Sequence, residues 1–539
     1  MPVLLPYFAL PDRWPGLFLL LISMLVCPLT FANTHSVDNA TCNRITGPAG
    51  VTAARWPDPK HAQTALINSG LKKTRFVTRD GHSLNVYIYR PSSFDSVHGP
   101  IWFVMHGIKR NADYYAQVAA PVAERHQALI IAIEFSRRYY PDSEDYTLGI
   151  TKHGRTGVQA KREGRYLKPE AFLYQEIERV FEAVRLALGG DQQGYYLFGH
   201  SAGAQFTHRM LTFIPCARVL GAVAANAGWY TLPVADNRKK FGMPYSLHGS
   251  PTESVNPDAL LSSPLMLLLG TNDTKGPGQD RNVRNTPAAM AQGSHRLARG
   301  QHYFETGQSL ARKLHTSFAW QLFLAPGAEH DVQQVIASAG YLLFAPKTEP
   351  ACLSSTANES GGIVFNEIMA ESPAGAMGDA NRDGVFHAKD EQFIEIVNTG
   401  NTPVCLTGWT LEDANQQAVH LFPLGRELAS GKALVVFGGG IPTGEFGGTI
   451  IQRSTATNGF RLNPIGGTLT LRDTGGKLVR QFSWGDCGSK VCSTDHWRDH
   501  LRLKSSIVRW PDADNQWRIH TQVTSKAMSP GFKSNGDSW

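Results

Sequence analysis

A serine, an aspartate and a histidine occur in the sequence in an order and in surroundings that favour nucleophilic catalysis by a hydroxyl group. Ser201 is the central residue of Gly199-His200-Ser201-Ala202-Gly203, which fits the G-x-S-x-G pattern of a strand-turn-helix elbow. The two glycines permit the sharp turn that lifts the hydroxyl above a sheet, and the helix N-terminus favours negative charge beside it. We therefore predict Ser201 as a nucleophile rather than a structural serine.

The two partners of such a serine are expected in loops after later strands. Asp273 follows the apolar run Leu265–Leu269, with Asp280 in the same loop as the reserve acid. His330 lies six residues after Leu324, where a last strand is expected to end. In this reading Asp273 orients the imidazole, His330 takes the Ser201 proton, and water then hydrolyses the acyl-serine.

An oxyanion hole needs two backbone N–H donors. One is expected from Ala202, directly after the nucleophile, and the other from Ile108, in the loop His106-Gly107-Ile108 that ends an earlier apolar strand. Gly107 lets this loop approach the substrate closely. His106 is interpreted as a side chain that orients the loop, because the base of this fold follows the nucleophile and the acid in the chain.

These residues need a sheet whose strand ends meet at one edge. Apolar strands are predicted at 100–105, 128–135, 195–198, 220–225, 264–269 and 318–324, after a hairpin turning at Asp80-Gly81, and helices at 114–125, 169–188, 202–213 and 308–314. Alternating strands and helices of this kind predict an α/β fold with a mostly parallel sheet covered on both faces.

Two aromatic residues follow the strand after the elbow. Trp229 and Tyr230 are candidates for lining a substrate pocket, and packing in the core is the equally weighted alternative.

Residues 73–344 resemble an α/β-hydrolase of the branch that contains secreted esterases and polyester-depolymerase-like proteins. The His-Gly loop, the elbow and the two late loops carry this resemblance. It implies a serine hydrolase of ester-type bonds, with polymeric esters among its candidate substrates and without metal or organic cofactor. A serine peptidase of the same fold and a non-enzymatic surface or adhesion protein on a hydrolase scaffold are the alternatives.

The chain changes character after Phe344. Residues 345–361 are rich in Pro, Ser, Thr, Asn and Gly and are predicted as a linker. Beyond it, short strands separated by Gly- and Pro-rich turns predict an all-β sandwich over residues 362–535. The predicted strands are 363–370, 392–397, 409–413, 433–437, 467–472 and 478–484.

Residues 362–484 resemble a lamin-tail domain, an immunoglobulin-like β module. The resemblance rests on Val364–Ile368, Phe393–Asn398, Leu406–Leu411 and Phe422-Pro423. It implies a targeting, anchoring or interaction module with a cell-surface or extracellular partner that the sequence does not identify. Glu367 and Glu395 are interpreted as structural.

An acidic loop between the first two strands of this module begins like an EF-hand. The proposed ligands of a structural Ca²⁺ ion are Asp379, Asn381, Asp383, the carbonyl of Val385, and Asp390. Asp390 replaces the usual Glu and the flanking segments are predicted strands, so a solvated hairpin tip is the alternative.

The first 32 residues read as a secretory signal peptide: Arg13, the apolar run Leu17–Val26, Pro28 and small residues ending at Ala32. A lipoprotein signal at Cys27 is the alternative. The run is too short to span a bilayer. The mature chain is therefore predicted to begin with an α/β domain over residues 33–344 and to be a secreted or periplasmic bacterial protein without a membrane span.

Removal of the signal leaves six cysteines in a chain expected in an oxidising compartment, where disulfides are the default. If bridges stay within domains, Cys42 joins Cys216, and we favour Cys352–Cys405 and Cys487–Cys492 among the three remaining arrangements. Zinc is disfavoured because no Cys-x-x-Cys occurs.

The net charge of only +7 over 539 residues does not favour nucleic acid as the main partner.

Overall fold

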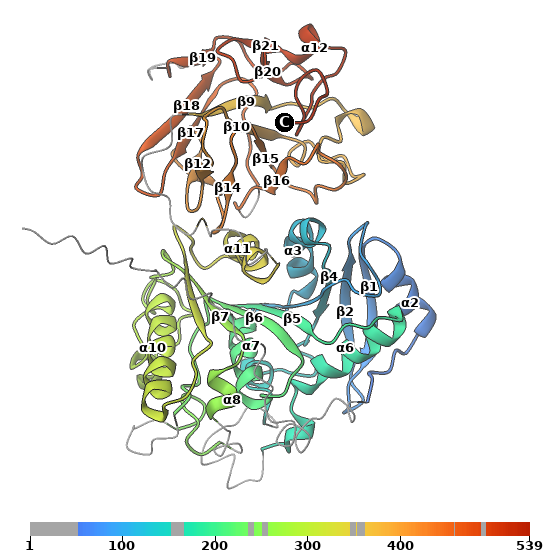
Figure 1. Cartoon of the computed structure of the whole chain (residues 1–539), viewed down its shortest axis with the longest axis vertical. Coiled ribbons are helices and arrows are strands. Elements are labelled where there is room, and N and C mark those ends of the chain that lie inside the picture. The colour runs from blue at the N-terminus through green and yellow to red at the C-terminus, as the bar shows by residue number, and fades with distance from the viewer. Residues whose placement is uncertain are drawn as a thin grey trace, which may run out of the picture.

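The computed structural model describes residues 52–151, 166–234, 242–250, 257–344, 352, 362–456, 459–486 and 492–539. The predicted signal peptide, Cys27, Cys42, Cys487 and the predicted linker except Cys352 lie outside these residues. The chain forms an α/β domain up to Phe344 and a β domain from Gly362, which lie one above the other in Figure 1.

The α/β domain is built on one sheet of eight strands. In chain order they are β1 (Gly70–Val77), β2 (Ser83–Arg90), β3 (Ile101–Met105), β4 (Leu129–Ile133), β5 (Tyr195–His200), β6 (Val219–Ala225), β7 (Leu265–Gly270) and β8 (Gln321–Ala325). The spatial order is β1-β2-β4-β3-β5-β6-β7-β8, and all pairs from β4 to β8 are parallel. Strands β3 and β4 are buried at every position, as expected for a parallel sheet covered on both faces.

Helices cover both faces of this sheet. They are α2 (Pro59–Ile67), α3 (Ala112–His126), α4 (Ser143–Thr147), α6 (Gln175–Leu188), α7 (Ala202–Phe213), α8 (Pro257–Leu261), α9 (Pro287–Met290), α10 (Arg296–Leu314) and α11 (Val332–Phe344), with a 3-10 turn at Pro169–Ala171. Helices α3 and α11 lie on the face nearer the β domain, and α6, α7, α8 and α10 lie on the other (Figure 1). The predicted α/β class and mostly parallel sheet are confirmed.

Several helices differ from the sequence prediction, which did not include α2, α4, α8 and α9, and two of the differences concern long helices. Helix α10 begins at Arg296 rather than Gln308, and α11 was not expected. The first half of α10 is polar and contains Gly300, which lowers helix propensity. The α11 segment is mostly apolar and buried, so it lacks the polar face that makes a surface helix recognisable.

The β domain is a sandwich of short strands around one apolar core. Its strands are β9 (Ile363–Met369), β10 (Phe393–Asn398), β11 (Val404–Cys405), β12 (Thr410–Glu412), β13 (Ala418–Leu421), β14 (Glu427–Leu428), β15 (Ala433–Phe437), β16 (Ile450–Arg453), β17 (Gly467–Arg472), β18 (Leu478–Trp484), β19 (Asp495–Trp497), β20 (Ile507–Arg509) and β21 (Trp517–Ile519). A 3-10 turn at Gly375–Gly378 and α12 (His520–Val523) complete the elements. One sheet has six strands and another has five, with β20 and β21 extending the larger sheet beside β9.

The C-terminal segment is part of the β domain core. Glu367 and Glu395 face each other on paired strands and are fully buried. Glu367 accepts hydrogen bonds from the Ser529 N–H and hydroxyl at 2.9 and 2.7 Å, and Glu395 accepts one from the Gly531 N–H at 2.9 Å. Both carboxyl groups therefore hold the tail against the sheet, which agrees with a structural role.

The β domain packs directly on helices α3 and α11. Leu421 and Leu424 belong to the same apolar cluster as Val335 and Ile336 of α11. The Leu424 N–H donates to the Ser338 hydroxyl at 2.8 Å, and this bond is buried. The two domains thus share apolar contacts in addition to their covalent connection.

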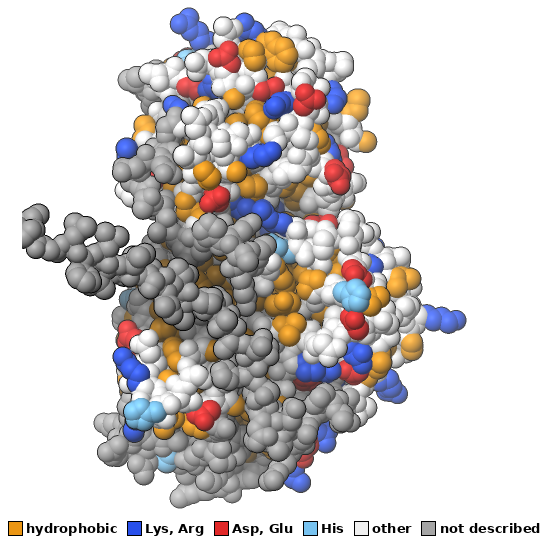
Figure 2. All heavy atoms as spheres, in the orientation of Figure 1, with side chains coloured by type: hydrophobic (Ala, Val, Ile, Leu, Met, Phe, Trp, Pro, Cys, Tyr) orange, Lys and Arg blue, Asp and Glu red, His pale blue; other side chains and the backbone are white. Residues whose placement is uncertain are grey.

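The surface face in Figure 2 carries Lys and Arg interspersed with Asp and Glu over both domains. Among the residues that the structure describes, no helix combines the length and apolar character needed to cross a bilayer.

Cys352 and Cys405 form a disulfide, in agreement with the predicted pair. Cys216 and Cys492 are also disulfide-bonded, but their predicted partners lie outside the described residues.

Candidate active site

Ser201 occupies a strained turn between β5 and α7. Its backbone has φ 59° and ψ −115°, a conformation that costs a non-glycine residue on the order of 1–3 kcal/mol. A Cβ atom at Gly199 would clash with the Gly203 carbonyl, and one at Gly203 would clash with the Met105 carbonyl. Glycine is therefore required at both positions, because α7 lies too close to β5 and to the end of β3 to leave room for a side chain.

The structure brings Ser201, His330 and Asp273 into one hydrogen-bonded chain. His330 Nε2 lies 2.9 Å from Ser201 Oγ, and His330 Nδ1 lies 2.8 Å from Asp273 Oδ2. Asp273 is 2% exposed, whereas Ser201 and His330 are partly exposed. A neutral imidazole that carries its proton on Nδ1 donates to the carboxylate and accepts from the serine hydroxyl, which is the geometry of a general base.

A buried arginine bonds Asp273, the last member of the hydrogen-bonded series that starts at Ser201. Arg296, the first residue of α10, is 2% exposed and donates to Asp273 Oδ1 at 3.2 Å and to Asp280 Oδ2 at 2.8 Å. Asp280, the reserve acid, is thus bonded to Arg296, and Asp273 is the carboxylate bonded to His330. Sequence patterns assign no role to Arg296, because it lies in the polar half of α10 that is not predicted to be helical.

Asn226, at the end of β6, ties the loops of the acid and the base together. Its Oδ1 accepts from the Gly270 N–H at 2.8 Å, and its Nδ2 donates to the Glu329 carbonyl at 3.1 Å. Glu329 directly precedes His330. Asn226 has φ 52°, which asparagine tolerates better than most residues, and this preference is the one sequence signal that points to it.

The expected oxyanion loop lies beside the nucleophile. A Cβ atom at Gly107 would stand 3.9 Å from Ser201 Cβ and 2.8 Å from the Tyr115 hydroxyl, so a side chain there would require Tyr115 to move. Within the part of the chain that the structure describes, neither the Ile108 N–H nor the Ala202 N–H donates to another protein atom. Both donors are therefore available to an oxygen bound next to Ser201.

His106 and His200 are buried neutral histidines. His106 Nδ1 donates to the Gly107 carbonyl and its Nε2 accepts from the Phe135 N–H, while burial lowers its pKa to about 3. This agrees with a loop-orienting role. The His200 ring packs 4.7 Å from the His330 ring, and burial, followed by the charge of His330, holds the pKa of His200 well below its usual range. A neutral His200 adds no repulsion when His330 becomes protonated.

Trp229 and Tyr230 are placed as core residues rather than as an open pocket wall. Tyr230 is fully buried and stacks on Tyr303 at 4.5 Å. Trp229 is 3% exposed and lies between the guanidinium groups of Arg209 and Arg284, at 4.1 and 4.6 Å from the ring centre. The structure thus favours the packing alternative over direct substrate contact.

The predicted calcium ligands form a hydrogen-bonded loop. Asp379 Oδ2 accepts from the Gly384 N–H, and the two oxygens of Asp383 accept from the N–H groups of Val385 and Ile441. Asn381 Oδ1 accepts from the Asp383 N–H.

Asp390, the last predicted ligand, lies 3.3 Å from His387. Nowhere in the described ranges do three or more His, Cys, Asp or Glu side chains come close enough to hold a metal ion. In this structure the carboxylates of the loop accept from backbone N–H groups or pair with a histidine, and Ca²⁺ binding by the five residues stays a prediction.

Comparisons with known proteins agree with both halves of this structure. The Lamin Tail Domain family matches residues 356–486. The structure of poly(aspartic acid) hydrolase-1 from Sphingomonas sp. KT-1 is 35% identical in sequence over 51% of this chain and 99% of that protein, with a TM-score of 0.46. LpqC, a poly(3-hydroxybutyrate) depolymerase from Bordetella parapertussis, is 31% identical over 56% of this chain and 97% of that protein, with a TM-score of 0.48. The search of curated proteins found no match.

Sequence identity above 30% over nearly the whole length of both solved proteins carries the assignment of the N-terminal half. The C-terminal assignment rests on the lamin-tail match and on the sandwich of strands observed there. The chain therefore belongs, through its α/β domain, to the α/β-hydrolase family of these two enzymes, and it carries a lamin tail domain behind that domain.

Proposed function

We propose that this protein is a serine hydrolase that cleaves ester-type bonds through an acyl-serine intermediate on Ser201. The observation that carries the proposal is the continuous hydrogen-bonded chain from Ser201 Oγ through His330 to Asp273, with distances of 2.9 and 2.8 Å. The family relationship supports the same conclusion, because both named relatives are hydrolases.

The proposed acyl transfer proceeds in the following steps, which the positions of these residues support. His330 Nε2 accepts the hydroxyl proton as Ser201 Oγ attacks the substrate carbonyl carbon, and the N–H groups of Ile108 and Ala202 donate to the oxyanion. His330 then returns the proton to the leaving alcohol. A water molecule, deprotonated in turn by His330, attacks the acyl-serine and releases the carboxylic acid. Asp273, held by Arg296, stabilises the imidazolium that forms in both halves of the reaction.

A polymeric ester is the substrate class that the relatives favour. One relative is named as a poly(3-hydroxybutyrate) depolymerase, and the backbone of that polymer is an ester. Poly(aspartic acid), named for the other relative, is linked by amide bonds. Amide hydrolysis at the same serine is therefore the second candidate, and the 35% identity to that relative is the observation that favours it.

We further propose that the protein acts outside the cytoplasm, after removal of residues 1–32, with its lamin tail domain serving attachment or targeting. The Cys352–Cys405 disulfide supports an oxidising compartment. The partner of the lamin tail domain would be a surface or polymer near the substrate.

The test compares hydrolysis rates on p-nitrophenyl esters of increasing chain length, a soluble oligomer of 3-hydroxybutyrate and an oligomer of aspartic acid. An ester hydrolase turns over the first two at rates that Ser201→Ala abolishes. Turnover of the aspartic acid oligomer alone would favour the amide candidate. Absence of turnover and of fluorophosphonate labelling would contradict both.

A further inference from the structure

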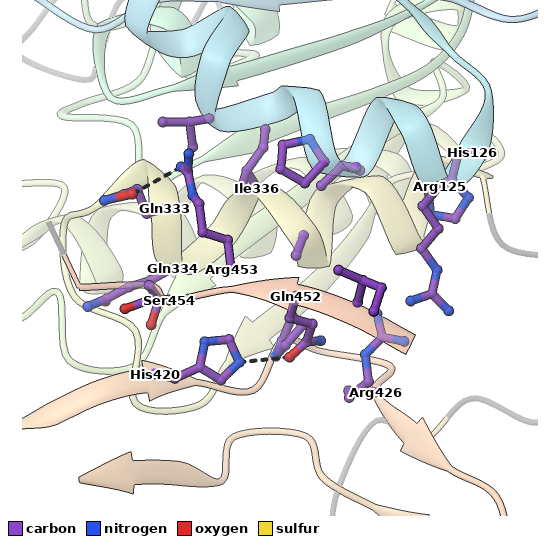
Figure 3. A pocket seen from close by; sticks show the side chains of 17 residues that line it. Arg125, His126, Gln333, Gln334, Ile336, His420, Arg426, Gln452, Arg453 and Ser454 are labelled. Atoms are coloured by element: carbon purple, nitrogen blue, oxygen red, sulfur yellow. Dashed lines mark hydrogen bonds between the residues drawn. The ribbon is translucent and has the colours of Figure 1, made fainter. Parts of the chain in front are cut away.

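A pocket lies at the junction of the two domains, away from Ser201. Helices α3 and α11 form one wall, and β13, β16 and the loop before β14 form the other. Its cavity volume is about 60 Å³, and the pocket is partly open to solvent. Figure 3 shows Arg125, His126 and Arg426 at one end of the pocket, with Gln452 and His420 nearer its middle.

Within the described part of the chain, the pocket contains a buried arginine, Arg426, whose Nε has no hydrogen-bond partner. Arg426 is 7% exposed, and this Nε atom is itself buried. A buried charge without a partner is strongly unfavourable, and native proteins satisfy such groups with a counter-charge, water or an ion. Arg426 therefore needs a hydrogen-bond acceptor other than the described side chains.

The surroundings of Arg426 add positive rather than negative charge. Burial lowers the pKa of Arg426 well below its usual range, and the neighbouring Arg125 lowers it further, while the Tyr341 hydroxyl acts in the opposite direction. His126 lies close enough for Arg125 and Arg426 to depress its pKa, behind the larger effect of burial. The two side chains that act on this pKa, Arg125 and Tyr341, bring no carboxylate to Arg426.

A second unused donor lines the same pocket. Gln452 is 7% exposed, and its Oε1 is 2.7 Å from His420 Nε2. This bond leaves Gln452 Nε2 buried without an acceptor. A guanidinium and an amide N–H are the donors that proteins use for carboxylate and phosphate oxygens, the guanidinium through two parallel bonds.

We propose that this pocket is a binding site for a small oxyanion, a carboxylate or a phosphate, held by Arg426 and Gln452 of the lamin tail domain and by Arg125 of the α/β domain. The anion would neutralise the arginines at the junction and bridge the two domains. It would therefore stabilise their packing without taking part in catalysis.

The experiment measures binding of inorganic phosphate and of acetate to the full chain by calorimetry, together with the melting temperature at constant ionic strength set by chloride. We expect saturable binding of at least one of the two anions. A ligand bound only to the folded state raises the melting temperature, and we expect a rise of about 3 °C or more. Binding of phosphate alone or of acetate alone identifies which oxyanion the site accepts.

Two matched variants separate the site from general charge effects. Arg426→Met removes the guanidinium and keeps much of its volume, so we expect anion affinity to fall at least tenfold. We also expect no loss of melting temperature in chloride, because a buried charged group whose Nε lacks an acceptor has been removed. Arg461→Met, at an exposed arginine of the same domain, should bind the anion as the original chain does.

Two results would overturn the proposal. One is the absence of saturable binding of both anions to the original chain. The other is equal anion affinity in Arg426→Met and the original chain. Hydrolysis of a small ester serves as the folding control, because none of the residues of the pocket touches Ser201.

Discussion

Arg453 of the lamin tail domain donates a hydrogen bond to the side-chain oxygen of Gln333 at 3.1 Å. Gln333 lies three residues after His330 in the chain. The Gln333 amide donates in turn to the Ala456 carbonyl at 3.3 Å. The first turn of α11, which begins two residues after the proposed base, is thus bonded to the second domain through both the oxygen and the nitrogen of the Gln333 amide. The lamin tail domain is therefore a structural neighbour of the site as well as a candidate for attachment.

This packing changes the expectation for the isolated α/β domain. The order of motifs along the sequence predicts that residues 33–344 alone stay active on a small soluble ester, since every proposed catalytic residue lies there. The structure adds that their α11 face would lose Leu421 and Leu424. We expect the shortened chain to hydrolyse small esters but to melt at a lower temperature than the full chain, as calorimetry would measure. Equal melting temperatures would show that the interface contributes nothing.

A single substitution tests the same interface in the full chain. Leu424 is 3% exposed, and Leu424→Asp would place an unpaired charge in the shared cluster, at a cost of roughly 3 kcal/mol or more of unfolding free energy. Leu478→Asp, at a leucine that is 48% exposed in the same domain, should change stability little. Urea denaturation of both variants measures the difference, and equal effects would argue against a shared core.

Arg296 is predicted to act as a positioning residue through Asp273. Arg296→Met leaves two carboxylates near each other without their cation, and removal of one member of a buried pair costs about 3–5 kcal/mol of stability. If the variant folds, we expect kcat to fall with little change in KM, since the imidazolium loses its oriented partner. Arg299→Met, at a nearby buried arginine that bonds backbone carbonyls, is the control. A fall in kcat no larger than in that control would contradict the role.

The two acidic residues of this loop should differ sharply. Asp273→Asn is expected to lower kcat by about 10⁴-fold, as for other triads in which the acid is neutralised. Asp280→Asn should cost far less, because Asp280 bonds Arg296 rather than His330. Steady-state kinetics on one soluble ester compares them, and a larger loss in Asp280→Asn would exchange their roles.

Buried neutral histidines predict a loss of stability in acid. Burial lowers the pKa of His106 to about 3 and those of His126 and His420 to about 4, against about 6.5 in an unfolded chain. Below pH 6.5 the unfolded state binds more protons than the folded state. The contribution of these histidines to the unfolding free energy is therefore fully present above pH 6.5 and falls as the pH drops toward 4.

Urea midpoints at pH 7 and pH 4.5 measure this loss. His420→Gln removes one of these groups and should lessen the difference between the two pH values, whereas His61→Gln, at an exposed histidine, should not. An equal pH dependence in His420→Gln and the original chain would contradict the assignment of His420.

The elbow was predictable because its requirements are local. Gly199, Ser201 and Gly203 lie within five residues, and the strand before them and the helix after them are recognisable from pattern alone. The two partners followed from chain order in the family. Asn226 and Arg296 could not be predicted, because their roles arise from contacts with Glu329 and Asp273, 103 and 23 residues away.

The domain interface was hidden for a related reason. Leu421 and Leu424 look like core residues of a β sandwich, and the apolar pattern of α11 looks like a buried element of the first domain. Nothing local indicates that these two surfaces bury each other. The additional strands β20 and β21 were missed because each has three residues, which is too short for a period to be visible.

The most direct test of the catalytic account is labelling of the full chain by a fluorophosphonate probe, in the original protein and in Ser201→Ala. The account predicts one covalent adduct per chain, located on the peptide that contains Ser201, and no adduct in Ser201→Ala at an unchanged melting temperature. His330→Ala should label at least about a thousandfold more slowly, because the hydroxyl has lost its base. Labelling of folded Ser201→Ala at the original rate would place the nucleophile elsewhere and contradict the account.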